Sequence, residues 1–400
     1  MIYSYKIKSR RSRKIAGHLC FIKRNIGAII LFLKYQILAM NKHSTMPASE
    51  AFRLLSMNTQ MSVIDVRSQG EYEKAHFGST VNIPILSDSH RHEVGLTYKI
   101  EGSEAAKVLG HKLVSGDYKE KLIHQWCESI KNHPQTPALI FCWRGGLRSR
   151  LAQDWVYQNS CEVNRVDSGY KGLRREALKA LENPAPFVIL SGMTGSGKTR
   201  LIHKLRHFVD LENLANHRGS AFGSHFGTSQ PQQATFENKL AQAIYQIADN
   251  TILEDESPNI GRCHLPDSIY NRMVIAPMVM IETPARLRAL EIYQEYIQMP
   301  LAYGMSLCEL EQSFAQNIER IRNKLGGLEC DKIKSLLNKA FKVDALDDDD
   351  IAAHLDWIER LLTQYYDKQY LYSLSLKSRK TLFQGSWQDC LDFSKRLQHE

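Results

Sequence analysis

Short apolar runs alternate with helical stretches in the first half of the chain. Met61–Val66 and Ala138–Phe141 are short and apolar enough to be buried strands, and a helical stretch around Lys119–Lys131 separates them. Strands that alternate with helices are typical of a parallel sheet covered by helices. The pattern therefore predicts a parallel α/β domain in this part of the chain.

A second group of elements follows a proline-containing linker at Asn183–Pro186. Its strands are predicted at Phe187–Leu190, Thr251–Leu253 and Met278–Ile281. A helix is predicted from Pro284, and from about Cys308 onward Leu, Ile and Phe recur at helical spacing. We therefore predict a basic N-terminal extension over residues 1–45, α/β domains over 46–182 and 183–307, and a helical C-terminal region over 308–400.

The net charge of +9 is concentrated in the N-terminal extension. Residues 1–40 contain nine Lys and Arg and no Asp or Glu, whereas the rest of the chain has equal numbers of basic and acidic residues. A nucleic acid would therefore have to be bound by a local patch, not by the net charge of the domains. The extension itself has two interpretations: a signal-like segment, or an upstream extension of a chain that starts at Met40 or Met46.

Two further features indicate the compartment. The apolar run Ile26–Leu33 is too short to span a bilayer, so we expect no membrane insertion. The eight cysteines are scattered and form neither a C-x-x-C pair nor a zinc-like spacing. Cysteines of this kind are typical of a reducing compartment, so the sequence predicts a cytoplasmic protein.

Residues 192–199 match the phosphate-binding pattern G-x-x-x-x-G-K-[ST] without a mismatch. A predicted strand precedes this loop and a predicted helix follows it, which is the context that the motif requires. The backbone amides of the loop can surround phosphate oxygens, and a lysine adds a point charge at the terminal phosphates. The predicted phosphate-binding residues are Gly192, Gly195, Ser196, Gly197, Lys198 and Thr199. A glycine-rich turn without a ligand is the alternative.

A P-loop enzyme usually needs a carboxylate near Mg²⁺ at the end of a second strand. The Thr199 hydroxyl can bind this ion, and Glu254 and Asp255 follow the strand predicted at Thr251–Leu253. The sequence therefore predicts a Mg²⁺ site formed by these three residues. A solvated acidic turn is the other interpretation of the two carboxylates.

Cys142 begins a second loop with distinctive chemistry, directly after the strand predicted at Ala138–Phe141. Residues 142–149 read C-x5-R-S, in which a nucleophile starts a loop that can surround an anion. Arg144 or Arg148 can pair with an oxyanion, and positive surroundings favour the reactive thiolate. A buried structural cysteine is the alternative, but two arginines and two glycines within the loop favour the nucleophile.

Other short motifs connect this loop to a known family. Asp65-Val66-Arg67, Glu71-Tyr72 and Asn82-Ile83-Pro84 resemble the rhodanese domain, and Cys142 falls where the rhodanese nucleophile lies. Gly78-Ser79 stands where rhodaneses usually have Pro-Gly. The loop is one residue longer than the usual rhodanese loop, which suits a tetrahedral, phosphate-like group.

A rhodanese domain followed by a P-loop domain resembles the bacterial tRNA 2-selenouridine synthase family over about residues 50–400. Further motifs similar to that family are Val94–Lys99, Gly169–Lys171, Asn216–Ser220, Gln230–Gln232, Glu256-Ser257 and Tyr365–Asp367. The resemblance implies an α/β protein with a rhodanese-like parallel-sheet domain, a P-loop NTPase-like α/β domain and a helical C-terminal part.

The resemblance also implies a transferase whose substrate is tRNA with 2-thiouridine at the wobble position. Members of this family replace sulfur at C2 by selenium, with selenophosphate as donor, and are associated with geranylation of that sulfur from geranyl diphosphate. We therefore expect no tightly bound cofactor, Mg²⁺ as a candidate ion, and a selenophosphate-producing enzyme as a functional partner. S-alkylation turns the thiocarbonyl sulfur into a good leaving group, and the P-loop could hold the diphosphate.

A tRNA substrate needs contacts of its own. Exposed anticodon bases can stack on aromatic or guanidinium planes, and Trp143 lies next to the predicted nucleophile. A second aromatic segment leads into basic residues near the C-terminus: Tyr365, Tyr366, Tyr370, Tyr372, Lys377, Arg379 and Lys380. Trp143, Tyr365, Tyr366, Lys377 and Arg379 are our candidate tRNA contacts, although we favour helix packing for the tyrosines.

Three other functions fit part of the sequence. A cysteine phosphatase shares C-x5-R-[ST], but Phe141 stands where many phosphatases have His, and the P-loop would have no role. A P-loop kinase with a rhodanese sulfur carrier and a non-catalytic nucleotide sensor are the others. Mass spectrometry of tRNA nucleosides from selenium-supplied cells with and without the gene separates these functions.

We expect residues 1–40 to be dispensable, because their composition is unlike the rest of the chain and they lie outside the resemblance. A chain that starts at Met46 should be soluble and should form 2-selenouridine at the wild-type level. Nucleoside analysis of tRNA from cells that express either form measures this. An insoluble, mislocalised or inactive shortened chain would show that the extension has a role.

Overall fold

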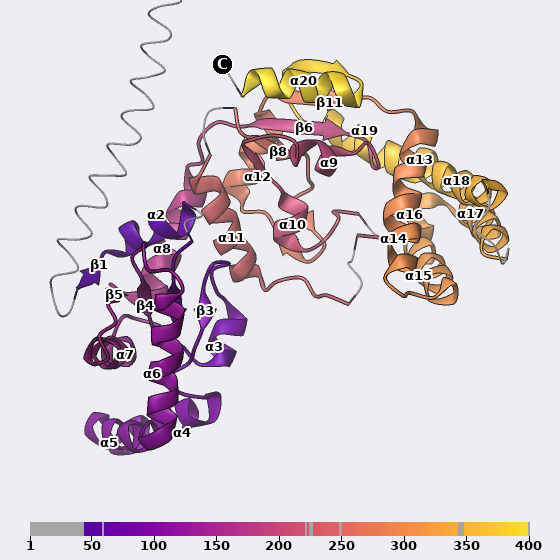
Figure 1. Cartoon of the computed structure of the whole chain (residues 1–400). Coiled ribbons are helices and arrows are strands. Elements are labelled where there is room, and N and C mark those ends of the chain that lie inside the picture. Colours follow the sequence, from indigo (N-terminus) through magenta and orange to yellow (C-terminus); the bar gives the residue numbers. More distant parts are fainter. Residues whose placement is uncertain are drawn as a thin grey trace, which may run out of the picture. The chain divides into compact units, whose positions relative to one another are not determined.

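The computed structural model describes residues 44–57, 60–220, 222–223, 227–247, 250–342 and 348–398. The chain forms two compact units (Figure 1). The first consists of the chain up to Glu73 together with Ser79–Glu176, and the second of Lys74–Gly78 together with Ala177–Glu400. The division lies close to the predicted boundary after residue 182. Of the predicted extension over residues 1–45, only the last two residues are among those described.

The first unit contains a five-stranded parallel sheet in the order β1-β5-β4-β2-β3. Its strands are β1 (Thr45–Met46), β2 (Val63–Asp65), β3 (Val81–Asn82), β4 (Leu139–Phe141) and β5 (Asn164–Val166). β2 and β4 confirm the strands predicted at Met61–Val66 and Ala138–Phe141. Because these two strands are parallel neighbours, the residues that follow them lie at one edge of the sheet.

Helices surround this sheet, and α6 shows why they pack. Its apolar residues recur at helical spacing, so Leu122, Ile123, Trp126 and Cys127 form one buried face. The Trp126 indole donates a hydrogen bond to the Ile83 carbonyl (3.0 Å) from within the core. The helices are α2 (Ala48–Ser56), α3 (Gln69–Lys74), α4 (Asp88–Glu101), α5 (Ser103–Leu113), α6 (Gly116–Lys131), α7 (Leu147–Gln158) and α8 (Gly169–Glu182).

The second unit contains another five-stranded parallel sheet, in the order β12-β11-β6-β8-β7. Its strands are β6 (Val188–Gly192), β7 (Phe208–Val209), β8 (Ile252–Glu254), β11 (Met278–Ile281) and β12 (Thr381–Gly385). β6, β8 and β11 were predicted, whereas β12 lies in the region that we predicted to be helical. β12 is a short strand whose partner, β11, lies about a hundred residues earlier, so the local pattern gave no signal of it.

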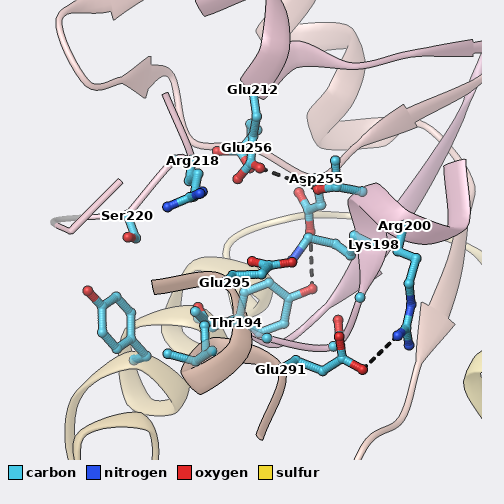
Figure 2. A pocket seen from close by; sticks show the side chains of 18 of the residues that line it. Thr194, Lys198, Arg200, Glu212, Arg218, Ser220, Asp255, Glu256, Glu291 and Glu295 are labelled. Carbon is cyan, nitrogen blue, oxygen red and sulfur yellow. Dashed lines mark hydrogen bonds and ion pairs between the residues drawn. The ribbon is translucent and has the colours of Figure 1, made fainter. Parts of the chain in front are cut away.

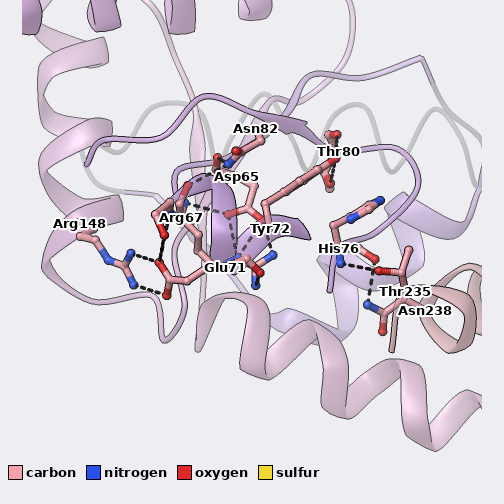
Figure 3. A network of polar contacts seen from close by, with 11 residues as sticks. Asp65, Arg67, Glu71, Tyr72, His76, Thr80, Asn82, Arg148, Thr235 and Asn238 are labelled. Atoms are coloured by element: carbon pink, nitrogen blue, oxygen red, sulfur yellow. Dashed lines mark hydrogen bonds and ion pairs between the residues drawn. The ribbon is translucent and has the colours of Figure 1, made fainter. Parts of the chain in front are cut away.

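Smaller elements complete this α/β part of the second unit. They are α9 (Lys198–Ile202), α10 (Leu211–Ala215), α11 (Gln233–Tyr245), α12 (Asp267–Ile275), α20 (Trp387–Leu397) and an antiparallel pair, β9 (Asn259–Ile260) and β10 (Cys263–His264). The segment Lys74–Gly78 binds to α11. The His76 backbone N–H donates to Thr235 Oγ1 (3.2 Å), and Asn238 Nδ2 donates to the His76 carbonyl (3.0 Å; Figure 3).

A group of helices follows β11 and packs around its own core of Phe314, Ile333 and Trp357 (Figure 1). The helices predicted from Pro284 and from about Cys308 are confirmed. The elements are α13 (Ala285–Tyr293), η1 (Gln294–Gln298), α14 (Met299–Ala302), α15 (Leu307–Arg320), α16 (Arg322–Leu325), α17 (Gly327–Ala340), α18 (Asp348–Leu361), η2 (Leu362–Tyr366) and α19 (Asp367–Ser375). Both η elements are π-helical turns. None of the described helices is long and apolar enough to cross a membrane.

Candidate functional site

The loop that begins with Cys142 is held at the end of β4 by main-chain contacts. The backbone N–H groups of Tyr170 and Lys171 donate to the carbonyls of Cys142 (2.8 Å) and Trp143 (3.0 Å). Gly169 has φ +54°, and a side chain there would collide with the Cys142 carbonyl. A glycine is therefore required where the two loops meet, and this requirement explains the first residue of the Gly169-Tyr170-Lys171 motif.

Cys142 itself is 3% exposed and belongs to the apolar core of the first unit. Its sulfur lies 3.2 Å from Ser149 Oγ, in the first turn of α7. The hydroxyl gives the thiol one polar neighbour. Burial alone is typical of a structural cysteine. The nucleophilic role of Cys142 is therefore supported only by the residues of its loop, and it stays a prediction.

The two arginines of this loop have different surroundings. Arg148 forms a bidentate ion pair with Glu71, with Nη–Oε distances of 2.6 and 3.2 Å, whereas Arg144 is exposed. Burial raises the pKa of Glu71, but the hydrogen bond and charge of Arg148 outweigh it, and the pKa lies below its usual value. Glu71 thus remains ionised and orients the Arg148 guanidinium, a role that the Glu71-Tyr72 motif alone did not reveal (Figure 3).

Trp143 presents an aromatic face beside this loop. Its ring is 39% exposed and stacks on the buried Tyr170 ring, with centroids 5.3 Å apart and an interplanar angle of 21°. The Arg67 guanidinium lies 4.0 Å from the Tyr170 centroid and is paired with Asp65 (2.6 Å) in the interior. The stack therefore rests on a buried ion pair and holds the exposed indole in one orientation.

The P-loop connects β6 to α9 in the second unit. Gly195 and Gly197 have φ of +79° and +77°, which residues with a side chain rarely adopt. Lys198 Nζ donates to the Gly192 carbonyl (2.8 Å), and the buried Ser196 hydroxyl has no hydrogen-bond partner among the described residues. The structure thus brings all the predicted phosphate-binding residues into one loop at the N-terminus of a helix.

A cavity of about 640 Å³ opens beside this loop (Figure 2). Its polar lining includes Lys198, Arg200, Arg218, Glu212, Glu256 and Glu295. Its aromatic and apolar lining includes Ile292, Tyr296, Met299, Tyr365, Tyr366 and Tyr370. Phosphate-binding groups and large apolar side chains therefore share one cavity.

Three carboxyl groups, of Glu212, Glu254 and Glu256, lie close together near the Thr199 hydroxyl; Glu254 and Glu256 are buried and Glu212 is partly buried. Thr199 Oγ1 donates to Glu254 Oε1 (2.7 Å) and lies 3.3 Å from Glu212 Oε2. The pKa of Glu212 is raised to about 8, mainly by burial and next by the charge of Glu256. The pKa of Glu256 is also raised to about 8, mainly by burial and next by the charge of Glu254. Burial and then Glu212 raise the pKa of Glu254 well above its usual value. The cluster thus holds protons near neutral pH.

These oxygen atoms have the chemistry that Mg²⁺ prefers, because this ion takes one or two carboxylates and completes its shell with phosphate and water. Among the described residues, no group of three or more His, Cys, Asp or Glu is arranged as a complete metal site. Thr199 and Glu254 would therefore hold Mg²⁺ only together with a bound phosphate.

Asp255, the third predicted metal ligand, does not join Thr199 and Glu254. Its carboxylate accepts hydrogen bonds from Ser191 Oγ (2.8 Å) and Lys377 Nζ (2.8 Å), and its Oδ1 lies 2.8 Å from Arg379 Nη1. Burial raises the pKa of Asp255, but the charges of Arg379 and Lys377 outweigh burial and lower it. Successive side chains of an extended segment point to opposite sides, so the carboxyl groups of Glu254 and Asp255 enter different surroundings.

The same ion pairs correct the candidate tRNA contacts Lys377 and Arg379. Their side chains are only 6% and 1% exposed, because both reach inward to Asp255. They are buried partners of a carboxylate and do not present a basic surface. The sequence pattern could not show this, since the aromatic-then-basic order is the same for an exposed helix and for a buried ion pair.

The tyrosines before them also lie at the P-loop cavity. Tyr365 and Tyr366 belong to η2 and line the cavity, and Tyr365 is buried. The Tyr370 hydroxyl accepts a hydrogen bond from the Gly192 backbone N–H (2.9 Å) and lies 3.2 Å from Asp255 Oδ2. Tyr296 comes from the other π-helical turn, η1. π-Helical turns are rare and are often found at functional sites, and here both contribute aromatic side chains to one cavity.

Several residues of this cavity were missed as site residues. Arg218 and Glu256 lie within two of the motifs quoted above, Asn216–Ser220 and Glu256-Ser257, so a signal for them existed. Glu212 and Tyr296 lie in helical segments without a motif, and only the tertiary contacts identify them.

Residues 185–400 match the family model described as the tRNA 2-selenouridine synthase AAA domain. The chain is 38% identical over 356 residues to the tRNA 2-selenouridine synthase of Shewanella frigidimarina (strain NCIMB 400), which covers 86% of this chain and 96% of the relative. It is 38% identical over 353 residues to that of Marinobacter nauticus (strain ATCC 700491 / DSM 11845 / VT8), which covers 85% and 95%. The match to that of Sulfurovum sp. (strain NBC37-1) has 37% identity over 368 residues and covers 88% and 98%.

Replacing Glu256 by Gln should change how stability depends on pH. The raised pKa, about 8, means that the protonated carboxyl stabilises the fold, and this contribution is lost as pH rises from about 4.5 through about 8. Glutamine has a similar shape and cannot ionise. The free energy of unfolding of the variant should therefore exceed that of the wild type by on the order of 1 kcal/mol or more at about pH 8.5. The two free energies should be equal near pH 5.

Urea unfolding at both pH values, without divalent cations, measures this difference. Glu311→Gln, on α15 outside the cavity, is the control and should not alter the pH dependence. Equal stability of Glu256→Gln and the wild type at the higher pH would contradict the raised pKa.

Proposed function

The chain belongs to the tRNA 2-selenouridine synthase family, and from this membership we propose that it replaces sulfur by selenium at C2 of wobble 2-thiouridine in tRNA. We further propose that selenophosphate is the selenium donor and that the reaction passes through an S-geranylated base made from geranyl diphosphate. The enzyme would then act as a transferase in two successive steps.

One observation carries the prenyl part of this proposal: the P-loop opens into a cavity that also has aromatic and apolar side chains among its lining residues. A diphosphate suits the loop at Gly192–Thr199, and a hydrocarbon chain suits the rings of Tyr296, Tyr365 and Tyr366. Burial of apolar surface favours such a chain by about 25 cal/mol per Å². The cavity thus combines the two chemistries that a prenyl diphosphate carries in one molecule.

In the first step, the thiocarbonyl sulfur would attack C1 of the geranyl group. The S–C1 bond forms, the C1–O bond breaks, the diphosphate leaves, and the base loses its N3 proton. Lys198 and the loop amides would bind the leaving diphosphate, whose charge increases as the bond breaks. Mg²⁺ held by Thr199 and Glu254 would supply further positive charge at the phosphates.

In the second step, the selenium of selenophosphate would attack C2. The C2–Se bond forms and the C2–S bond breaks, so that geranyl thiol leaves, and hydrolysis of the P–Se bond releases phosphate. The loop Cys142–Ser149 would hold the tetrahedral donor, with Arg148 oriented by Glu71 and Arg144 exposed for a second contact. Cys142 would position the selenium for this attack.

The tRNA base would approach the exposed face of Trp143. Unpaired anticodon bases are recognised by stacking on aromatic rings, and this indole is held by Tyr170 and Arg67. A rigid platform costs little ordering entropy when a base stacks on it. A selenophosphate-producing enzyme would be the functional partner that supplies the donor, and no tightly bound cofactor takes part in this scheme.

We expect Cys142→Ser to abolish selenium incorporation, because the oxygen is nearly isosteric with sulfur but is less polarisable and far less readily ionised, so it cannot position the selenium in the same way. The fold and tRNA affinity should remain close to wild type. Nucleoside mass spectrometry after reaction with selenophosphate and geranylated tRNA measures incorporation. Cys161→Ser, at another buried cysteine of the same unit, is the matched control and should remain active. Wild-type 2-selenouridine formation by Cys142→Ser would exclude an essential role.

We expect Lys198→Ala to block S-geranylation of 2-thiouridine tRNA while selenation of tRNA that is already geranylated survives. Loss of a charge-assisted contact typically weakens binding by about 1.5–3 kcal/mol, or roughly tenfold to a hundredfold. Assays of the two steps with purified protein measure the separation, and Lys204→Ala, at an exposed lysine, is the control. Equal loss of both steps would contradict the division of roles, and ATP hydrolysis coupled to turnover would favour a kinase-like enzyme.

A further inference from the structure

We propose that Arg218 is a second diphosphate-binding residue, which acts together with Lys198 of the P-loop and stabilises the departing diphosphate. The inference rests on the function proposed above. It adds a residue from outside the P-loop motif and assigns it a role in the bond-breaking step.

Arg218 lies in a turn whose position is tightly determined. Its backbone N–H donates to the Gly223 carbonyl (2.8 Å), and its carbonyl accepts from the Ser220 N–H (2.7 Å). The next residue, Gly219, has φ +65°, and a Cβ there would lie 2.6 Å from Glu256 Oε2. The absence of a side chain lets the turn pack directly against the buried carboxyl group that follows β8.

The Arg218 side chain is directed into the cavity by Tyr296. Its guanidinium carbon lies 4.5 Å from the centroid of the Tyr296 ring, and this ring is 9% exposed. A guanidinium over a buried aromatic face is attracted by the ring and loses few of its hydrogen-bond donors. Both residues line the P-loop cavity, and Figure 2 shows Arg218 and Lys198 reaching it from different segments.

The other cations of the cavity already have carboxylate partners. Lys377 is paired with Asp255 (2.8 Å). Arg200 is paired with Glu291 (2.8 Å) and lies over the Trp387 ring. Within the described part of the chain, Arg218 forms no ion pair within 4.0 Å. Arg218 and Lys198 are therefore the lining cations for which the described residues show no close ion pair. Their charges act on cavity carboxyl groups from farther away, Arg218 on Glu295 and Lys198 on Glu212 and Glu256, and a diphosphate would compete for them.

A diphosphate needs more positive charge than one lysine supplies. Lys198 is a point charge, whereas a guanidinium can donate two parallel hydrogen bonds to phosphate oxygens. When the C1–O bond of a prenyl diphosphate breaks, its electron pair moves to the diphosphate oxygen and the leaving group gains negative charge. A fixed cation at this place stabilises the transition state more than the ground state, so it should act on kcat as well as on binding.

The test uses inorganic pyrophosphate as probe and the full-length protein. Titration calorimetry should show that Arg218→Ala reduces pyrophosphate affinity roughly tenfold to a hundredfold. Arg218→Lys should reduce it less, because lysine keeps the positive charge but cannot donate two parallel hydrogen bonds. Single-turnover S-geranylation should slow in both variants at saturating geranyl diphosphate. Arg206→Ala, at an exposed arginine that does not line the cavity, is the matched control.

Tyr296 is tested as a positioning residue. Tyr296→Phe retains the ring face and should keep pyrophosphate affinity, whereas Tyr296→Leu removes it and should weaken binding several-fold. If Arg218→Ala does not fold, judged by circular dichroism, Arg218→Lys and Tyr296→Leu still provide the test.

The outcomes separate this inference from the proposed function. If Lys198→Ala weakens pyrophosphate binding and Arg218→Ala does not, the inference is overturned and the proposed function remains. If neither variant weakens binding, the diphosphate role of the P-loop is itself contradicted. If Arg218→Ala weakens only tRNA binding, with a reduced salt dependence, Arg218 is a tRNA contact and the inference is wrong.

Discussion

Parallel pairing of β6 with its two neighbours is the constraint on which the P-loop site depends. Leu190 of β6 pairs with Glu254 of β8, and Gly192 pairs with Ile281 of β11. Parallel strands end at the same edge of a sheet, so the phosphate-binding loop, the carboxylates after β8 and the start of α13 all leave from one edge. The Thr199–Glu254 hydrogen bond depends on this register, because a shift of one residue would exchange Glu254 with Asp255.

Buried ion pairs then connect the C-terminal helices to that edge. Arg288 donates to the Thr194 carbonyl (3.1 Å) and forms two short contacts with Asp367, at 2.8 and 2.7 Å. Asp255 is held by Lys377 and Arg379. Removing one partner of such a pair leaves an uncompensated buried charge, which typically costs about 3–5 kcal/mol. The helical region is therefore part of the site and supplies its aromatic wall.

The two units use buried charge differently. In the first, Asp65 and Arg67 neutralise each other and support the stack of Tyr170 and Trp143, so the charge serves rigidity. In the second, the carboxyl groups of Glu212, Glu254 and Glu256 have raised pKa values, chiefly because they are removed from solvent and also because they repel one another. Under the proposed function, binding of Mg²⁺ together with a phosphate would release protons from this cluster, so that ligand binding would depend on pH.

The sequence by itself determined the features that depend on contiguous residues. The P-loop at residues 192–199 and the loop after Cys142 could be predicted because their chemistry resides in one short segment next to an apolar strand. The α/β order of both units was predictable for the same reason. Tertiary structure alone decided the features that join distant segments. It paired Asp255 with Lys377 and Arg379, added β12 to the sheet and placed Arg218 over Tyr296, because each contact joins residues that are far apart in the chain.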